Sequence, residues 1–419
     1  TLNAKNNPNL KWAMISGTTN PTLTSSINTH TFVTLTENEL YNANQQKDYY
    51  IVLWISETGG LQTDNGIFNG VVKFEDTDTT TNTPPAKQTL TSLELDSQIN
   101  ETVLTSFTNT SKNDNSTGIY ASEDDLGTSY YFRGNITNNY VKFAGYYWRI
   151  IRINGDGSLR VIYDGTSAHT NSDASTDRQI GTSAYNTNYN DNAYVGYMYG
   201  TAGSTTYEAT HTNTNNSTIK TYIDNWYNTN IKNTPNASYV VDAIYCNDRT
   251  RVTDATKMAE LDTMFSLTST GEGFGTKVTY YGVFNRMTSD ATSVTPSLKC
   301  PETRDKFTVS NTLGNGKLDN PIGLITFDEM IFGGSYIYMG DTYQNNETYL
   351  YNGTNWYWTM SPFAFDDVYA RVGYGRWGAV DFNDVDNASG GARPVISLLS
   401  SGVTDGNGTA STPFLIGSE

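Results

Sequence analysis

The chain has 419 residues, long enough for two or three domains, and only 16% of them are charged, with a formal net charge of −17. No basic stripe relieves this acidity, so nucleic acid and anionic membrane surfaces would be repelled and we expect neither as a partner. No run of about 18 apolar residues occurs either, so we expect no membrane span.

The composition favours strands and turns over long helices. Thr, Asn, Ser and Gly abound, and 30 Tyr, 16 Phe and 7 Trp supply most of the large apolar groups. This is typical of secreted β-proteins. We therefore predict a mostly β fold with α+β character: a small antiparallel β-sandwich over 1–76, a linker with a short helix over 77–117, and a large domain over 118–419.

The first 76 residues show strand patterns separated by turns. Apolar or alternating runs predict strands at 11–16 (KWAMIS), 30–35 (HTFVTL), 47–55 (KDYYIVLWI) and 70–74 (GVVKF). This spacing is that of a small antiparallel β-sandwich.

A low-complexity segment follows at 77–85 (TDTTTNTPP), and we interpret it as a linker. Four apolar residues then recur at four-residue spacing: Leu95, Ile99, Val103 and Phe107. This period predicts one helix with a single apolar face, packed on a domain as a connector.

The large domain opens with a hairpin. The segment 140–153 (YVKFAGYYWRIIRI) predicts a strand pair or one long strand, NGDGS at 154–158 predicts a tight turn, and 159–163 (LRVIY) predicts the returning strand. The polar segment 168–218 shows no clear helix or strand period, and a loop of this length is usually functional or flexible.

Three helices and a further strand are predicted downstream. Apolar residues at helical spacing predict a helix over 219–231 with Ser217 as its cap, and a short helix is expected over 257–265. The segment 278–284 reads as a strand. Thr326 and Glu329 form a capping-box pattern, which predicts a short helix from 326 onward.

The segment 355–398 concentrates aromatic, glycine and acidic residues. The run VISLL after Pro394 predicts a buried strand. Alternation over 369–376 predicts a half-exposed strand loosened by glycine. A hairpin that merely closes a core is the alternative.

This segment resembles the end of a known domain. WYWTMSP at 356–362 followed by GGARPVISL at 390–398 is similar to the C-type-lectin-like domain of bacterial surface proteins, with the formylglycine-generating-enzyme fold as a more distant relative. The resemblance continues through 130–165, 298–311 and 321–329. It implies a fold whose C-terminal strands carry a ligand-binding loop surface, here over 363–387.

A second resemblance concerns the first domain. YYIVLWISETGG at 49–60 and NGIFNGVVKF at 65–74 are similar to later strands of TasA/camelysin-like domains, which occur in surface and biofilm-fibre proteins. The resemblance implies that the sandwich over 1–76 lacks a strand. An upstream segment or a strand from another subunit would have to fill the open groove.

The chain has two cysteines, Cys246 and Cys300, and neither has a CxxC partner or a His at metal spacing. In an extracellular setting we predict a disulfide between them. The three histidines, His30, His169 and His211, share no spacing, and no nucleophile–base motif accompanies them. We therefore do not expect an enzyme.

Two sets of candidate site residues lie in the last hundred positions. Aromatic and Arg side chains suit contact with a sugar or a protein: Tyr369, Arg371, Tyr374, Arg376 and Trp377. Alternatively, Trp377 fills the core. Calcium is the one cofactor considered, because oxygen ligands cluster nearby: Asp381, Asn383, Asp384 and Asp386, with Asp366 and Asp367 to complete the site. A solvated acidic turn is the alternative.

These patterns give two functional hypotheses. The first is an extracellular structural subunit of a bacterial surface fibre or pilus-like assembly, which self-associates into filaments by strand exchange and displays the lectin-like domain. The second is an adhesin on the cell surface that binds glycan or host protein and does not polymerise. A sandwich that lacks a strand would favour the first.

Overall fold

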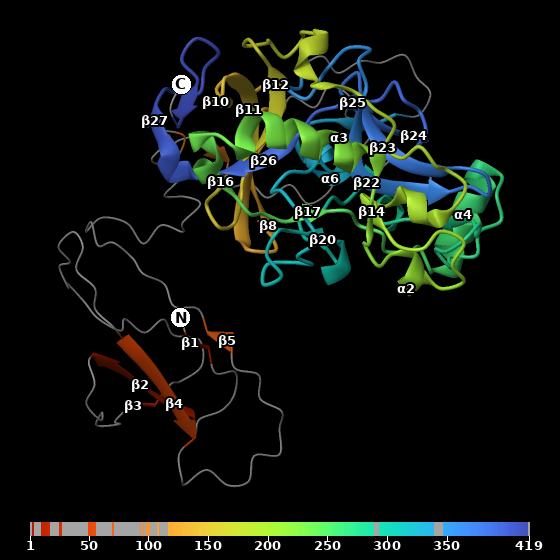
Figure 1. Ribbon diagram of the computed structural model, residues 1–419, viewed down its shortest axis with the longest axis horizontal. Coiled ribbons are helices and arrows are strands. Elements are labelled where there is room, and N and C mark those ends of the chain that lie inside the picture. The colour runs from red at the N-terminus through yellow and green to blue at the C-terminus, as the bar shows by residue number, and fades with distance from the viewer. Residues whose placement is uncertain are drawn as a thin grey trace. The chain divides into compact units, whose positions relative to one another are not determined.

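The computed structural model describes residues 116–288, 293–338 and 347–417, and before them Leu93, Leu95, Gln98 and the strands β1 to β7. The chain divides into two compact units, Thr1–Asn82 and Thr83–Glu419. Each unit is described by itself, and Figure 1 labels its elements.

Two small sheets are described in the N-terminal unit. The strand β2 (Leu10–Ser16) pairs antiparallel with β4 (Tyr49–Ile55) over its whole length, from Leu10↔Ile55 to Ser16↔Tyr49, and β3 (Ser25–Ser26) lies on the other side of β2. β1 (Leu2–Asn3) pairs with β5 (Asn69–Gly70).

The strands predicted at 11–16 and 47–55 are thereby confirmed. The strand predicted at 30–35 lies outside the described residues. Of the one predicted at 70–74, only Gly70 is described, as the end of β5.

A ten-stranded sheet forms one half of the C-terminal unit (Figure 1). Its main path runs β16-β26-β12-β11-β10-β28-β27, and β9, β8 and β6 continue from β11. The strands are β6 (Ile99–Asn100), β8 (Gly118–Asp124), β9 (Gly127–Arg133), β10 (Tyr140–Phe143), β11 (Tyr146–Ile153), β12 (Leu159–Gly165), β16 (Val240–Val241), β26 (Val395–Leu398), β27 (Val403–Asp405) and β28 (Phe414–Ile416).

The predicted hairpin is confirmed within this sheet. The segment 140–153 is a strand pair, β10 and β11, and β12 returns antiparallel to β11. β12 is buried along its whole length because β11 and β26 flank it and the rest of the unit covers it.

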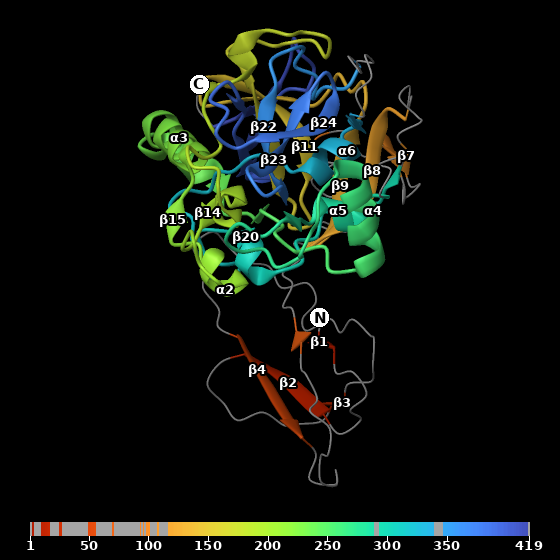
Figure 2. The ribbon, with the colours of Figure 1, turned by 90° about the vertical axis from the view of Figure 1, so that its right-hand side faces the viewer.

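A seven-stranded sheet forms the second half, with the order β13-β25-β22-β23-β24-β21 and β18 beside β22. Figure 2 shows β22, β23 and β24 from the side. The strands are β13 (Gly181–Thr182), β18 (Thr279–Tyr280), β21 (Tyr336–Ile337), β22 (Tyr357–Phe365), β23 (Ala370–Arg376), β24 (Ala379–Asp384) and β25 (Gly391–Ala392).

The segment 355–398 therefore serves both sheets. β22 to β25 belong to the seven-stranded sheet, whereas β26, the predicted buried strand, lies in the ten-stranded sheet. Only Arg393 and Pro394 separate β25 from β26, so the chain passes from one sheet to the other within two residues. The mostly β class with α+β character is confirmed.

Short ladders tie distant segments to these sheets. β7 (Phe107–Thr108) pairs with β19 (Ser293–Val294), β14 (Met198–Tyr199) with β15 (Asn215–Asn216), and β17 (Tyr245–Cys246) with β20 (Lys306–Phe307).

The helix predicted across Leu95 to Phe107 is wrong at two of its four apolar positions. Ile99 lies in a strand opposite Ile119 of β8, and Phe107 lies in a strand opposite Val294 of β19. Pairing with strands that already exist outweighs a local four-residue period, since tertiary context overrides weak helix propensity.

The helices follow their caps. In α3 (Thr218–Tyr227) the Ser217 hydroxyl accepts from the Lys220 amide, as predicted, and η4 (Asn228–Lys232) continues the helix. In α6 (Phe327–Phe332) the capping box of Thr326 and Glu329 is present, which confirms that prediction.

The helix expected at 257–265 is α4 (Ala255–Phe265). The strand expected at 278–284 is only β18, because α5 (Val283–Arg286) begins three residues later. The remaining short helices are η2 (Thr176–Arg178), η3 (Asn192–Val195), α2 (Tyr207–Thr210), η5 (Pro235–Tyr239), η6 (Thr303–Asp305) and η7 (Ser400–Gly402). In the described part of the chain, none of the helices has the length and apolar character needed to cross a membrane.

A charged cluster lies in the interior of the C-terminal unit. The Asp164 carboxylate lies 2.7 Å from Nη2 of Arg178, 2.9 Å from Nη2 of Arg393 and 3.9 Å from Nη1 of Arg149, and all four side chains are fully buried. Burial lowers the pKa of Arg149 to about 10, against the opposing effect of Asp164, so this guanidinium is still charged at neutral pH. One carboxylate thus helps to hold three buried cations.

We predict that Asp164→Asn lowers the free energy of unfolding by about 3–5 kcal/mol, because it leaves buried arginines without their counter-ion. Denaturant unfolding of the variant and the wild type measures the difference. Asp405→Asn is the control, since Asp405 is exposed, and it should change stability by less than about 0.5 kcal/mol. Equal stability of the two variants would contradict the role of the cluster.

Candidate functional site

The residues predicted to bind ligand lie at the two ends of β23, not on one surface. Tyr369 and Arg371 are at its start, beside the turn that follows β22, whereas Tyr374, Arg376 and Trp377 are at its end, beside the turn into β24. The two ends of a seven-residue strand are separated by roughly 20 Å. They are therefore considered separately.

At the first end, the exposed Tyr189 stacks on the half-buried Tyr369. The rings of Tyr189 and Tyr369 lie 4.8 Å apart at 27°, and the Ala370 amide donates to the Tyr189 carbonyl at 2.7 Å. Tyr189 is 37% exposed and the adjacent Val368 is 48% exposed, among the most exposed large apolar side chains described. We call Tyr189, Val368 and Tyr369 the aromatic turn.

The backbone of the aromatic turn is held by one carboxylate. Asp366 Oδ1 accepts from the amides of Val368 and Tyr369 at 3.2 and 2.7 Å, and Asp367 has a φ of +86°. A φ in this region is uncommon for a residue other than glycine and is held by the surrounding structure. The turn is thus fixed before any ligand arrives.

Arg371 borders the aromatic turn and is itself anchored. Its guanidinium lies 2.6 Å from Asp366 Oδ2 and 3.2 Å from Asp384 Oδ1, its cross-strand neighbour. It also lies over the Phe382 ring at 5.4 Å. Because its side chain is still 29% exposed, Arg371 can contact a ligand at the edge of the turn.

At the second end of β23, Tyr374 is part of the core. It is only 8% exposed, its ring lies 5.0 Å from that of Trp356, and its hydroxyl donates to Asp381 Oδ2 at 2.8 Å. Burial raises the pKa of this hydroxyl, and the neighbouring Asp381 adds to the rise. The prediction that Tyr374 faces a ligand is therefore wrong, because glycine-containing β23 is covered on both faces rather than half-exposed.

Trp377 and Arg376 are partly exposed and form their own contact. Trp377, with φ +56°, and Gly378, with φ +70°, make the two-residue turn between β23 and β24, as a type I′ hairpin requires. The Arg376 guanidinium covers the Trp377 ring at 3.6 Å, and the Tyr338 ring is 5.9 Å from it. Arg376 thus occupies the ring face that a sugar would need.

The oxygen ligands predicted for calcium do not converge. Asp381 accepts from Tyr374 and from the Phe382 amide, Asn383 accepts from the Asp384 amide, and Asp384 pairs with Arg371. Within the described residues, no group of three or more His, Cys, Asp or Glu side chains is placed to hold a metal ion. The calcium site stays a prediction, and Asp386 and Asp367 are not part of any such group.

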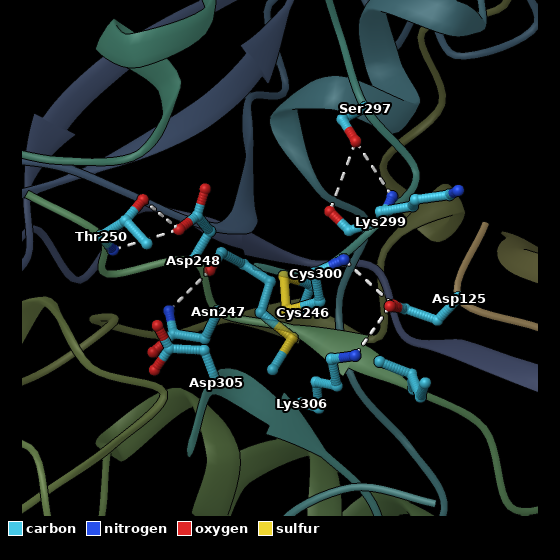
Figure 3. The surroundings of a disulfide bond; sticks show 12 residues. Asp125, Cys246, Asn247, Asp248, Thr250, Ser297, Lys299, Cys300, Asp305 and Lys306 are labelled. Carbon is cyan, nitrogen blue, oxygen red and sulfur yellow. Dashed lines mark hydrogen bonds and ion pairs between the residues drawn. A yellow bond between two sulfur atoms is a disulfide. The ribbon is translucent and has the colours of Figure 1, made fainter. Parts of the chain in front are cut away.

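The predicted disulfide is present. Cys246 and Cys300 are joined, with their Cα atoms 5.6 Å apart and 54 positions apart in the sequence. Figure 3 shows the Asp125 carboxylate beside it, accepting from the Cys300 amide at 3.0 Å and from Lys306 Nζ at 2.7 Å. The bond therefore fastens the segment before Cys300 to β17 and its partner strand β20.

A small polar cavity adjoins the disulfide. Its volume is about 40 Å³, and charged side chains dominate its lining, among them Asp124, Arg152, Arg160, Asp328 and Glu329. Burial alone would raise the pKa of Glu329, but Arg160 and Arg152 outweigh it and hold the pKa below its ordinary value. A cavity of this size has room for water only, far from the ~300 Å³ of a typical ligand pocket.

The two described histidines contact carboxylate and carbonyl oxygens. His169 has Nδ1 2.9 Å from Asp173 Oδ2 and Nε2 3.0 Å from Asp177 Oδ1. Buried His211 contacts the Gly273 carbonyl, and burial, with Arg249 adding to it, lowers its pKa well below the usual value.

Sequence reasoning missed Tyr189. It lies within the poorly patterned segment 168–218, and its local sequence NTNYND gives no sign that it stacks on Tyr369, a residue 180 positions away. Asp366 was considered only as a calcium ligand, whereas it holds the aromatic turn and Arg371. The acidic pair DD between two strands is a usable signal for an Asx-type turn.

Comparison with known proteins adds no assignment: no protein-family model, curated protein or solved structure matches this chain.

We predict that replacing both cysteines, Cys246→Ser with Cys300→Ser, lowers the free energy of unfolding by about 4 kcal/mol. Without the disulfide, the unfolded chain regains the conformational entropy that closing this loop removes. Thermal and denaturant unfolding of the oxidised wild type and the double variant measure this. Reduced wild type is the matched control and should behave like the variant. If both unfold like the oxidised protein, the disulfide does not stabilise the unit.

Proposed function

We propose that this protein is an extracellular adhesin of a bacterial cell surface, which binds a glycan or a protein through the aromatic turn. The observation that carries the proposal is the stack of the exposed Tyr189 on the half-buried Tyr369, beside Val368 and Arg371. Tyrosine rings and Arg side chains are among the groups that contribute most to binding surfaces.

The rigidity of the turn favours binding. Asp366 fixes the backbone amides of Val368 and Tyr369 with one oxygen and Arg371 with the other. A ligand would meet side chains that have already lost most of their freedom, so less entropy is lost on association.

The surrounding charge restricts the ligand. Asp367 is exposed next to the turn. Burial raises the pKa of Asp384, Arg371 opposes the rise, and the nearby charges of Asp366 and Asp386 add to it. An acidic polysaccharide would be repelled here. Neutral sugars, whose C–H faces stack on tyrosine rings, and basic protein surfaces are the compatible ligand classes.

Two further features agree with an extracellular binding protein. A disulfide persists in oxidising compartments, and this chain has one in its C-terminal unit. The resemblance of 356–362 and 390–398 to C-type-lectin-like domains implies a ligand surface on the loops of this sheet.

The test is a binding screen of the full chain against immobilised neutral glycans and basic host proteins. Tyr189→Ala with Tyr369→Ala should reduce affinity at least about tenfold for a retained ligand, since each aromatic contact contributes roughly 1 kcal/mol. Leu399→Ala, at another site that is 39% exposed, is the control and should bind normally. Unchanged binding by a folded double variant would refute the proposed surface.

A fibre subunit is the second candidate, and one observation favours it. In the described N-terminal unit, β4 is the last strand of the order β3-β2-β4, and its seven residues YYIVLWI include no charge and no proline. Uncharged edge strands invite pairing with another chain unless something covers them. Head-to-tail pairing of this kind yields open filaments.

Electron microscopy of the assembled native material distinguishes the two functions. Filaments in which β4 pairs with a strand of a neighbouring subunit are expected for a fibre subunit. Discrete particles, with every strand of the first unit paired inside its own chain, would exclude the fibre subunit. The adhesin would then be the remaining function.

A further inference from the structure

Four polar side chains meet beneath α3 in an arrangement that the binding function does not use. Lys220 is fully buried, and its Nζ donates to Asp224 Oδ2 at 2.6 Å and, more distantly, to Oδ2 of the exposed Asp319 at 3.3 Å. Asn320, which is 1% exposed, donates from Nδ2 to the other oxygen of the same carboxylate, Asp224 Oδ1, at 2.9 Å. One buried carboxylate therefore holds an amine and an amide side by side.

A second lysine faces the amide from its other side. Lys232, at the end of η4, donates from Nζ to Asn320 Oδ1 at 2.8 Å. A cation at this oxygen draws electron density from Cγ of Asn320 and would stabilise negative charge that develops on Oδ1. The side-chain amide is thus polarised at the oxygen and hydrogen-bonded to a proton carrier at the nitrogen.

This arrangement contains the parts that amide exchange requires. A desolvated lysine is a strong nucleophile once it has lost a proton, and the carboxylate that would take the proton is its hydrogen-bond partner. Fixed positions raise the effective concentration of the reacting groups. The three reacting side chains, Lys220, Asp224 and Asn320, are buried, so water competes poorly as a nucleophile, whereas Lys232 reaches Asn320 from the exposed end of η4.

We propose that the side chains of Lys220 and Asn320 become joined by an amide bond, with Asp224 as the proton carrier. Lys220 Nζ passes a proton to Asp224, and its lone pair then forms a bond to Cγ of Asn320 while Lys232 holds the oxygen. The Cγ–Nδ2 bond breaks as Asp224 returns the proton to the leaving nitrogen. Nζ gives up its second proton through Asp224, and the nitrogen departs as ammonium. No oxidant, reductant or co-reactant is consumed.

The bond would have a defined structural effect. It would tie α3 to the segment before β21 that holds Asn320, and it would close a covalent ring that encloses the smaller ring made by Cys246 and Cys300. The outer ring would resist reducing agents, which open the inner one.

The test is peptide mapping of the full wild-type chain after denaturation and reduction. We expect a branched peptide that joins the fragments with Lys220 and Asn320, and a chain lighter by one ammonia molecule than its sequence. Mass alone is insufficient, because an Asn–Gly pair such as Asn154–Gly155 also loses ammonia when it forms a succinimide. Fragmentation of the branched peptide must therefore locate the bond on Lys220 Nζ.

Matched variants assign the roles. Asp224→Asn and Lys220→Met should give only linear peptides, and Lys232→Met should leave a measurable unlinked fraction in freshly folded protein. Lys306→Met removes a lysine paired with a different carboxylate, Asp125, and should retain the branched peptide. The proposal is wrong if folded wild-type protein yields both fragments unlinked and has the full mass of its sequence. Lys220 and Asp224 then form only an ion pair.

Discussion

The C-terminal unit depends on arginines that are buried and then neutralised by hydrogen bonds and single carboxylates. Asp164 is surrounded by three arginines, Glu329 is held by Arg152 and Arg160, and Asp305 pairs with Arg249. Removing one carboxylate would leave a buried guanidinium without its counter-ion in a region that water does not reach. The free energy of unfolding would fall by several kcal/mol. Aromatic rings line these clusters, as where Arg149 lies 3.8 Å from the centre of the Tyr140 ring. This unit, rich in Tyr, thus places several of its charged side chains in the interior.

Much of the local structure follows from the sequence, because local signals decide it. The hairpin over 140–163, the Ser217 cap and the capping box at Thr326 are short-range patterns, and all are present. The disulfide was predicted from two cysteines in a chain expected to be exported, and it is present. The helix predicted around Ile99 and Phe107 failed because its positions pair with β8 and β19, and no local period reports on such distant partners.

The candidate site could be predicted only in part for the same reason. The segment around 366–371 was identified from its aromatic and acidic composition, but Tyr189 joins it from a polar region across the fold. Tyr374 and Trp377 are of residue types that are common on binding surfaces, yet both are covered. One is buried against Trp356 and the other is capped by Arg376, and burial of that kind depends on what packs above the strand.

The crosslink between Cys246 and Cys300 also changes what proteolysis can do. α4 and α5 lie on the chain between the two cysteines, so a protease that cuts once there produces two ends that remain attached to the same molecule. A chain cut once in this region would keep its two parts joined until the disulfide is reduced. The cut would appear only on a reducing gel, and the sheet that carries the aromatic turn would stay attached to the rest of the chain.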